Sequence, residues 1–574
     1  MNRVKRPRRA FLGIPETLES RQLLHGGGEH HLTEMLAGLE RATSQLSRKV
    51  SVQAARNHAP LAPRIQEPAV NNARISPDDV HIETKPMQDP DPGNRHAASD
   101  FQIVLAGSRR VVWQSYNVTG LEKEHIHLGD GKFVGPYTGR TALKPNTNYV
   151  VRIRFKDSSG DRATQYSPWA TRPFRTTQGT VQAGGQGPII KGWRVLRPGF
   201  TVEVAAEGFQ LPVAIAFVPN PGNTANAPLY YVAELYGTIK MVQRNGAVHT
   251  YAKDLLNFDP TGRFPGSGET GLAGLVVDPA SGDLFATLLY SDAVGDHHPK
   301  IIRLHSNDGG HTAASQATIL NIATEVQGAS HQISHISIGP DGLLYVHVGD
   351  GMAPGVARDL TQFRGKILRL NFDGSPSSDN PYYNPDDGIN ATDYIFASGF
   401  RNPFGGAWRA KTNELYEVEN GPLTDRLAVV VKGRDYGYNY SDASMKNFAV
   451  YNWNPAVAPV NIAFVQRDSQ GGSKFPTGMQ DHAFVTESGP TFATGPQSRG
   501  KRVVEFAFNE QGRRISGPIP LLRYAGKGKA TAAALAAGPD GLYFSELYAD
   551  KAGNNPTLPQ ARILRIRYVG TRAK

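Results

Sequence analysis

Short runs in which apolar and polar residues alternate dominate the chain after residue 75. In the run LLYVHV, Leu344, Val346 and Val348 alternate with Tyr345 and His347, the period of two that a β-strand produces. The 61 glycines and 40 prolines among 574 residues supply frequent turns. The pattern predicts an all-β protein with few long helices.

One larger unit recurs six times between about residues 200 and 569, at intervals of roughly 60–70 residues. Each copy begins with an apolar strand that ends near a Pro-Asp or Pro-Asn turn, as in GLAGLVVDP and ISHISIGPDG, and closes with a strand of the form x-Ile-x-x-Leu. Repeated four-stranded units without helices favour a β-propeller, since radial closure protects the strand edges. We therefore expect a six-bladed β-propeller over 200–569. A series of β-sandwiches is the alternative.

The segment 71–177 has its own short β-rich runs and is expected to fold separately. Its string LKPNTNYVVR places Leu143 six residues before Tyr149, which resembles the corner of a fibronectin type III domain, where a tyrosine hydroxyl holds the backbone. The resemblance implies a β-sandwich over 71–177. The Gly-rich stretch that follows makes 178–199 the expected linker.

The first 70 residues read as a basic export segment and linker. ETLESRQLL resembles the LEPR-x-LL element of exported planctomycete proteins, with Ser20 in place of the usual proline. The resemblance implies an exported protein, whether periplasmic, extracellular or at the cell surface. No apolar run is long enough for a membrane-spanning helix.

The distribution of charge and the absence of cysteine argue against several classes of function. Of the net charge of +11, residues 1–25 carry +4 and residues 562–574 carry +5. Because the basic residues gather at the two ends, the sequence argues against a nucleic-acid groove. The absence of cysteine excludes disulfides, thiolate metal sites and thiol catalysis.

Three polar loops stand out from the repeats: SHQISHISIGPDG with the following VGD, then GFRNPFG, then ENGP. Each follows or precedes an expected strand, where a propeller can present side chains near its axis. These loops, with GLAGLVVDP and GKILRLNFDG, resemble in order and spacing the soluble dehydrogenases of glucose, sorbosone and other aldoses that use pyrroloquinoline quinone (PQQ). This family resemblance covers about 200–569 and implies a six-bladed propeller that oxidises a sugar by hydride transfer to PQQ, with a calcium ion and an external electron acceptor.

Carried over residue by residue, the resemblance implies catalytic, cofactor-binding and calcium-binding positions. They are His331 as base, Asp350 as its partner, Arg401 beside the quinone, Asn402 and Asn420 as cofactor contacts, and Gly421 and Pro422 as calcium ligands through their carbonyls. The residue types suit the reaction. An imidazole accepts a hydroxyl proton near neutral pH, a carboxylate fixes its tautomer, and an arginine and calcium stabilise negative charge on a quinone oxygen.

The sequence departs from the family in its last repeat. Members often carry Arg-x-Arg there to hold the carboxylates of the cofactor, whereas Thr531 and Ala533 stand at those places. The alternative function is therefore a non-catalytic extracellular propeller that binds carbohydrate or a surface partner. His331 as a structural histidine and Arg401 as a tie between blades are the corresponding alternatives for the site.

Overall fold

The computed structural model describes residues 57–570, apart from 69, 76, 78–79, 120–122, 129–130, 141, 178–186, 260–268, 329, 354, 467–472, 490–494, 498 and 549–557. The export-type motif and most of the basic N-terminus therefore lie outside the described residues. The prediction of an all-β protein is confirmed, because the described elements are strands apart from one α-helix, α2 (Ala391–Tyr394), and a few turns of 3₁₀-helix. No helix in this part of the chain is long and apolar enough to cross a membrane.

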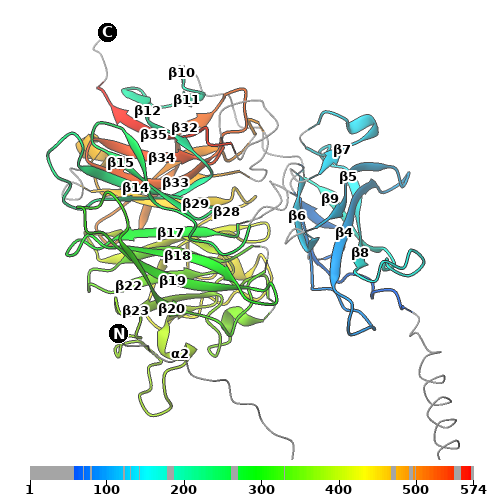
Figure 1. Ribbon diagram of the computed structural model, residues 1–574. Helices are drawn as coiled ribbons and strands as arrows, with labels where there is room; N and C mark the ends of the chain where they lie inside the picture. The colour runs from blue at the N-terminus through cyan, green and yellow to red at the C-terminus, as the bar shows by residue number, and fades with distance from the viewer. Residues whose placement is uncertain are drawn as a thin grey trace, which may run out of the picture. The chain divides into compact units, whose positions relative to one another are not determined.

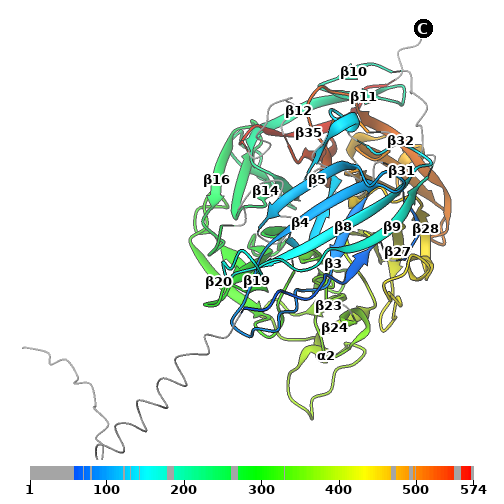
Figure 2. The same ribbon diagram turned by 90° about the vertical axis from the view of Figure 1, so that its right-hand side faces the viewer.

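The first part of the described chain, which we call the small domain (58–177), contains two sheets (Figure 1). One sheet has the order β1-β3-β6, and the other has the order β2-β9-β8-β4-β5-β7. Their strands are β1 (Ile65–Glu67), β2 (Ala73–Ile75), β3 (His81–Thr84), β4 (His96–Leu105), β5 (Val111–Val118), β6 (His125–His127), β7 (Lys132–Phe133), β8 (Asn148–Asp157) and β9 (Ala170–Thr176). In Figure 2 the strands β5, β4, β8 and β9 run side by side across the view.

Apolar side chains from both sheets form the core of the small domain. Trp113 and Tyr149 are fully buried in it. The Tyr149 hydroxyl accepts a hydrogen bond from the backbone N–H of Lys144 at 3.0 Å and lies 2.8 Å from the Tyr137 hydroxyl. Because β1 pairs with β3, strand pairing in this domain begins at Ile65, ahead of the expected boundary at residue 71.

The rest of the chain forms six further sheets within the described residues, which we call the ring (189–568). Four sheets are consecutive antiparallel meanders. They are β13 (Pro212–Phe217), β14 (Pro228–Glu234), β15 (Thr238–Gln243) and β16 (Val248–Ala252); β17 (Leu272–Val277), β18 (Leu284–Ser291), β19 (His297–His305) and β20 (Ser315–Asn321); β21 (Ile333–Ile338), β22 (Leu344–Val348), β23 (Lys366–Leu370) and β24 (Ile395–Ser398); and β25 (Pro403–Arg409), β26 (Glu414–Glu419), β27 (Asp425–Val430) and β28 (Ala449–Trp453).

The other two sheets of the ring combine strands that are distant in sequence. One has the order β10-β11-β32-β31-β30-β29, and the other has the order β12-β35-β34-β33. Their strands are β10 (Ile189–Ile190), β11 (Trp193–Val195), β12 (Phe200–Phe209), β29 (Pro459–Val465), β30 (His482–Glu487), β31 (Arg502–Phe508), β32 (Arg514–Tyr524), β33 (Ala532–Gly538), β34 (Gly541–Glu546) and β35 (Ala561–Tyr568). The expected linker 178–199 thus contains two short strands that join a ring sheet.

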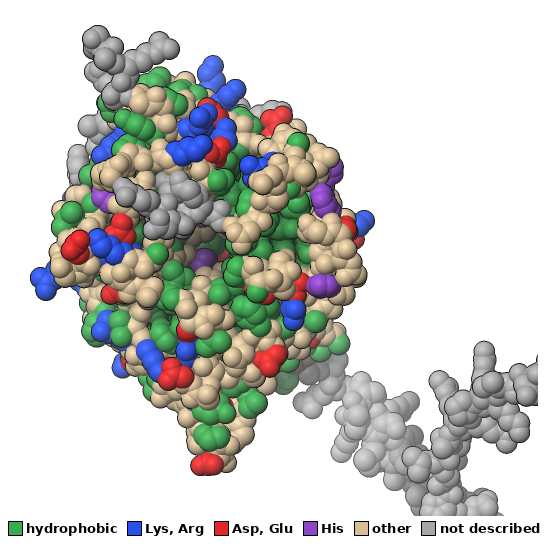
Figure 3. Space-filling view, turned by 90° about the vertical axis from the view of Figure 1, so that its left-hand side faces the viewer, with side chains coloured by type: hydrophobic (Ala, Val, Ile, Leu, Met, Phe, Trp, Pro, Cys, Tyr) green, Lys and Arg blue, Asp and Glu red, His purple; other side chains and the backbone are tan. Residues whose placement is uncertain are grey.

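One end strand of each of the six sheets contacts the corresponding strand of the next sheet, from β13 through β17, β21, β25 and β29 to β33, and β33 contacts β13 again. Pairing of β12 with β35 joins the two ends of the ring. These six strands enclose a cavity of about 70 Å³, and His335 is among the residues that line it. Figure 3 shows a hollow near the middle of one face of the molecule. The closed order of strands brings strand ends from different repeats to a common rim.

Candidate active site

The three polar loops meet because of where they lie on the strands. In an antiparallel meander, the start of the first strand and the end of the second lie at the same edge. His331 precedes β21 and Asp350 follows β22, while Arg401 and Asn402 precede β25 and Asn420 follows β26. The two sheets are neighbours in the ring. The predicted site residues therefore share one rim.

His331 and Asp350 form a buried pair at this rim. The Nδ1 atom of His331 lies 2.6 Å from Oδ1 of Asp350, and the two residues are 2% and 1% exposed. With Nδ1 donating to the carboxylate, Nε2 is the nitrogen that carries the lone pair. The arrangement suits a proton acceptor whose charged form is stabilised by its neighbour.

The backbone around the pair is fixed by close contacts. His331 adopts a left-handed φ of 61°, which is uncommon for a residue with a side chain. A Cβ atom on Gly349 would lie 2.3 Å from the His331 carbonyl oxygen, so only glycine fits there. The Asp350 N–H donates to the Arg401 carbonyl at 2.7 Å. The histidine pair and the arginine loop are thus held in register through the main chain.

Glu269, just before β17, is a rim residue that sequence reasoning missed. Its carboxylate accepts a hydrogen bond from the His331 N–H at 2.8 Å and from the Asn402 side chain at 3.2 Å. It therefore connects the two predicted loops from a third sheet. The buried Oδ1 of Asn402 has no hydrogen-bond partner among the described residues. A hydrogen-bond donor of a ligand would satisfy this buried acceptor.

Arg401 is paired with two carboxylates of the small domain. Its Nη2 lies 3.0 Å from Oε1 of Glu67 and 3.5 Å from Oε2 of Glu83, and its Nη1 donates to the Asn420 carbonyl at 3.2 Å. Arg401, Glu67 and Glu83 are 3%, 8% and 4% exposed. The predicted quinone-facing arginine thus has partners more than 300 residues earlier in the chain.

Electrostatics keeps the Arg401 guanidinium charged. Burial by itself would lower its pKa, but the neighbouring Glu67, Tyr438 and Glu83 outweigh burial and hold the pKa well above its ordinary value. Two carboxylates therefore face one guanidinium in this buried cluster.

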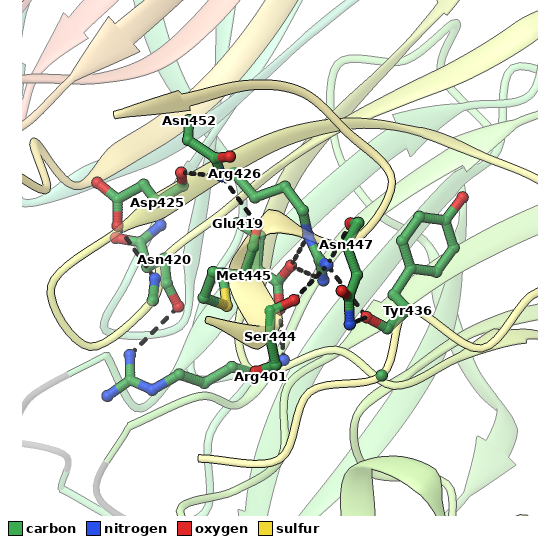
Figure 4. Close-up of polar contacts among 12 residues, drawn as sticks. Arg401, Glu419, Asn420, Asp425, Arg426, Tyr436, Ser444, Met445, Asn447 and Asn452 are labelled. Atoms are coloured by element: carbon green, nitrogen blue, oxygen red, sulfur yellow. Dashed lines mark hydrogen bonds and ion pairs between the residues drawn. The ribbon is translucent and has the colours of Figure 1, made fainter. Parts of the chain in front are cut away.

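Glu419 ties the arginine loop to its own sheet (Figure 4). Its carboxylate accepts the Arg401 N–H at 2.5 Å and is also ion-paired with Arg426, and both Glu419 and Arg426 are fully buried. The Arg426 guanidinium further donates to the carbonyls of Tyr436 and Asn447 at 3.2 and 2.9 Å. Arg426 is therefore a structural arginine, and the hydrogen-bond partners of its guanidinium come from β26 and from the loop between β27 and β28.

The turn after β26 contains Gly421 and Pro422, the expected calcium-binding positions. Both are buried, and the Gly421 N–H donates to Asp425 at 3.0 Å. A Cβ atom on Gly421 would lie 2.0 Å from the Thr424 carbonyl oxygen, so the turn requires glycine here. The described residues contain no group of three or more histidine, aspartate or glutamate side chains placed to hold a metal. A calcium ion here would depend on main-chain oxygens.

At the start of β33, in the last sheet of the ring, the rim is formed by small, buried side chains. Thr531 is fully buried and its hydroxyl donates to the Ser488 carbonyl, while Ala533 is 3% exposed and its carbonyl accepts from Thr486 at 2.6 Å. Lys529 lies just before β33, and its carbonyl accepts a hydrogen bond from the buried ammonium of Lys501 at 3.2 Å. The positions of the missing arginine pair are thus occupied by small, packed side chains.

A pocket of about 280 Å³ lies beside Glu67 and Glu83, the two carboxylates that face Arg401. The small domain lines it with Ile65, Gln66, Glu67, Glu83 and Lys85, and the ring lines it with Pro422, Tyr438 and Tyr440. The Tyr440 hydroxyl donates to the Ala353 carbonyl at 2.6 Å, close to the loop of Asp350. The pocket offers carboxylate, amide and phenol groups to a polar ligand of modest size.

Two further histidines of the same motif do not join the site. His335 and His347 are buried with their rings 5.0 Å apart, and burial lowers the pKa of His335 to about 4 and that of His347 well below its ordinary value. Both are therefore neutral, and the His347 Nδ1–H donates to the Pro403 carbonyl at 3.1 Å. They pack inside the ring.

Comparison with known proteins places this geometry in context. The family profile described as Glucose / Sorbosone dehydrogenase matches residues 209–486. Quinoprotein glucose dehydrogenase B of Acinetobacter calcoaceticus is 32% identical over 146 residues, which are 21% of this chain and 29% of that protein. Aldose sugar dehydrogenase YliI of Escherichia coli K12 is 26% identical over 181 residues, 28% of this chain and 47% of that protein. The chain thus spans about a third to a half of these relatives' lengths.

Solved structures support the fold. A structure titled glucose dehydrogenase superposes with a TM-score of 0.52 at 18% identity and covers 64% of this chain and 98% of its own. A second, titled crystal structure of glucose dehydrogenase, gives a TM-score of 0.50 at 18% identity over 64% of this chain and 99% of its own. The segment 209–486, which contains His331, Asp350 and Arg401, therefore matches the glucose/sorbosone dehydrogenase family.

Proposed function

We propose that this protein is a quinone-dependent sugar dehydrogenase that oxidises an aldose or a related sugar at the rim of the ring. The observation that carries the proposal is the buried His331–Asp350 pair, 2.6 Å apart and joined through the main chain to Arg401. All three residues lie inside the segment that matches the sugar dehydrogenase family. The ring would be a six-bladed β-propeller, and the small domain a fibronectin type III-like sandwich whose corner is Tyr149.

In this proposal His331 is the general base. Its Nε2 takes the proton of the sugar hydroxyl, and Asp350 stabilises the imidazolium that results. When bound, PQQ would supply the acceptor for the hydride that leaves the sugar carbon bearing this hydroxyl. Glu269 positions both His331 and Asn402. The cofactor would also need an external electron acceptor to reoxidise it after each turnover.

The fit of the residues to PQQ differs between the two sides of the site. On one side, the buried Oδ1 of Asn402, which has no hydrogen-bond partner among the described residues, suits a hydrogen-bond donor of a bound group. The Arg401 side does not suit an anionic quinone in this arrangement, because Glu67 and Glu83 already occupy the guanidinium. A calcium ion held by the carbonyls of Gly421 and Pro422 would offset part of the negative charge.

Reconstitution tests the proposal. The purified chain is mixed with PQQ and calcium, and reduction of an electron-accepting dye is followed with a panel of aldoses, with His331→Gln as the matched control. We expect sugar-dependent dye reduction in the wild type and a loss of about 10²–10⁴-fold in the variant. Equal rates in both proteins would remove His331 from the reaction.

A second candidate function is a non-catalytic propeller that binds carbohydrate or a surface partner. The packed Thr531 and Ala533, where family members often carry arginines, favour it. It predicts sugar binding by calorimetry with no quinone binding and no dye reduction. In either case we propose that the protein is exported, as the resemblance of ETLESRQLL to an export element implies.

A further inference from the structure

Arg401 has one set of partners in the ring and another in the small domain. Within the ring its Nη1 donates to the Asn420 carbonyl. Its Nη2 faces Glu67 on β1 and Glu83 on β3. The side-chain amide of Gln66 donates to Glu83 at 2.9 Å and joins the two strands at this point. The outer face of the guanidinium is therefore covered by the small domain.

The covering groups have the wrong charge for an anionic ligand. PQQ is a tricarboxylate, and a carboxylate or quinone oxygen approaching Arg401 would meet two buried carboxylates. Asp350 adds a third negative group near the guanidinium, since it also raises the Arg401 pKa. The exposed Lys85 is the cationic side chain among the residues that line this pocket. The docked arrangement thus disfavours the cofactor that the proposed function requires.

The two strands that carry the carboxylates are held differently: β3 is the central strand of its sheet, with Ile82 buried in the small-domain core, whereas β1 is paired on one side. β1 is an edge strand of a three-stranded sheet and pairs only with β3, at Ile65 and Glu67. Leu423, in the turn after β26, packs against the core of the small domain. Release of Arg401 would break two ion pairs, and because neither β1 nor β3 belongs to a sheet of the ring, it would leave those sheets intact.

We propose that Glu67 and Glu83 compete with the quinone for Arg401, so that the cofactor binds only when β1 and β3 release the arginine. The inference rests on the proposed function and deepens it. The small domain is then a determinant of cofactor loading: its two carboxylates select against anionic ligands while docked. Neutral sugars, which carry no charge to be repelled, are not excluded by this means.

Calorimetry with PQQ on the full-length chain tests the proposal. The double variant Glu67→Gln/Glu83→Gln keeps the side-chain shape and removes both charges. We expect it to bind PQQ at least about tenfold more tightly than the wild type, the change that one charge-assisted contact produces. The matched control is Glu207→Gln/Glu510→Gln, which removes two exposed carboxylates of the ring and should leave the affinity unchanged.

Hydrogen exchange gives a second measurement that does not depend on activity. Saturating PQQ should increase exchange of the backbone amides in 65–67 and 81–84 of the wild type. Equal affinities of wild type and double variant, or slower exchange in these strands with PQQ, would overturn the competition and leave the proposed function standing if dye reduction persists. Absence of PQQ binding in both proteins would overturn the competition and the quinone-dependent function together.

Discussion

Arg401, in the loop before β25, and Arg426, on β27, are two buried arginines whose partners come from different parts of the molecule. Arg426 is fully buried and bonded to Glu419 and to carbonyls of its own sheet region. Arg401 is nearly as buried, but its carboxylate partners come from the small domain. Burial and an ion pair therefore do not by themselves distinguish a structural arginine from one placed for chemistry.

The difference lies in what must move to free each guanidinium. Freeing Arg426 would leave Glu419 uncompensated inside the sheet, together with the carbonyls of Tyr436 and Asn447. Freeing Arg401 requires movement of β1 and β3, and its main-chain bond to Glu419 remains. Arg426 thus belongs to the framework that holds the rim, whereas the carboxylate partners of the Arg401 guanidinium belong to the small domain.

The largest expected effect on stability comes from Arg426. Arg426→Met should lower the free energy of unfolding by about 3–5 kcal/mol, because a fully buried carboxylate loses its cation. Denaturant unfolding measures it, with the exposed Arg513→Met as the control, for which a change within about 0.5 kcal/mol is expected. A loss for Arg426→Met no larger than the control's would mean that the ion pair is dispensable.

A smaller loss is expected for Arg401. Arg401→Met removes the guanidinium that faces Glu67 and Glu83 but leaves the Glu419–Arg426 pair in place, so the loss should be about 1–3 kcal/mol. Hydrogen exchange should increase in 65–67 and 81–84 and stay unchanged in β26. If hydrogen exchange increased equally in β26, Arg401 would also be needed to hold the sheets of the ring, as Arg426 is.

A third buried cation is Lys366 at the start of β23, whose hydrogen-bond partners within the described part of the chain are main-chain carbonyls. Its Nζ donates to the carbonyls of Val356, Ala357 and Arg364, and burial lowers its pKa to about 8. In the unfolded chain Lys366 therefore holds its ammonium proton more tightly than in the folded protein. The free energy of unfolding should consequently rise by up to about 1.4 kcal/mol per pH unit between pH 8 and 10.5. Lys366→Met should lose this gain. Identical pH profiles in wild type and variant would contradict the assigned pKa.

Strand patterns alone predicted most of the ring. The alternation in LLYVHV and the repeated Pro-Asp turns correspond to β22 and to the ends of first strands. The pairing of β12 with β35 was not predicted, because the two strands are separated by about 350 residues and their partners are set only by closure of the ring. β10 and β11 were hidden by their short length after a Gly-rich stretch.

The site was predicted unevenly for a similar reason. His331 and Asp350 lie two positions outside adjacent paired strands, so motif and topology agree on their meeting. Glu67 lies in a three-residue strand inside a segment that was interpreted as a linker, and nothing local marks it as a partner of Arg401. Glu269 has a polar loop as its only local signal. Side chains that reach a site from another domain carry no motif of their own.

The central claim is that His331 removes a proton while hydride leaves the sugar. A single-turnover reaction of the PQQ-loaded chain with glucose and with glucose deuterated at C1, followed by quinone absorbance, tests it most directly. We expect slower quinone reduction with the deuterated sugar, and a rate lowered about 10²–10⁴-fold in His331→Gln with PQQ affinity unchanged. Quinone reduction that is insensitive to both the isotope and the substitution would contradict the account.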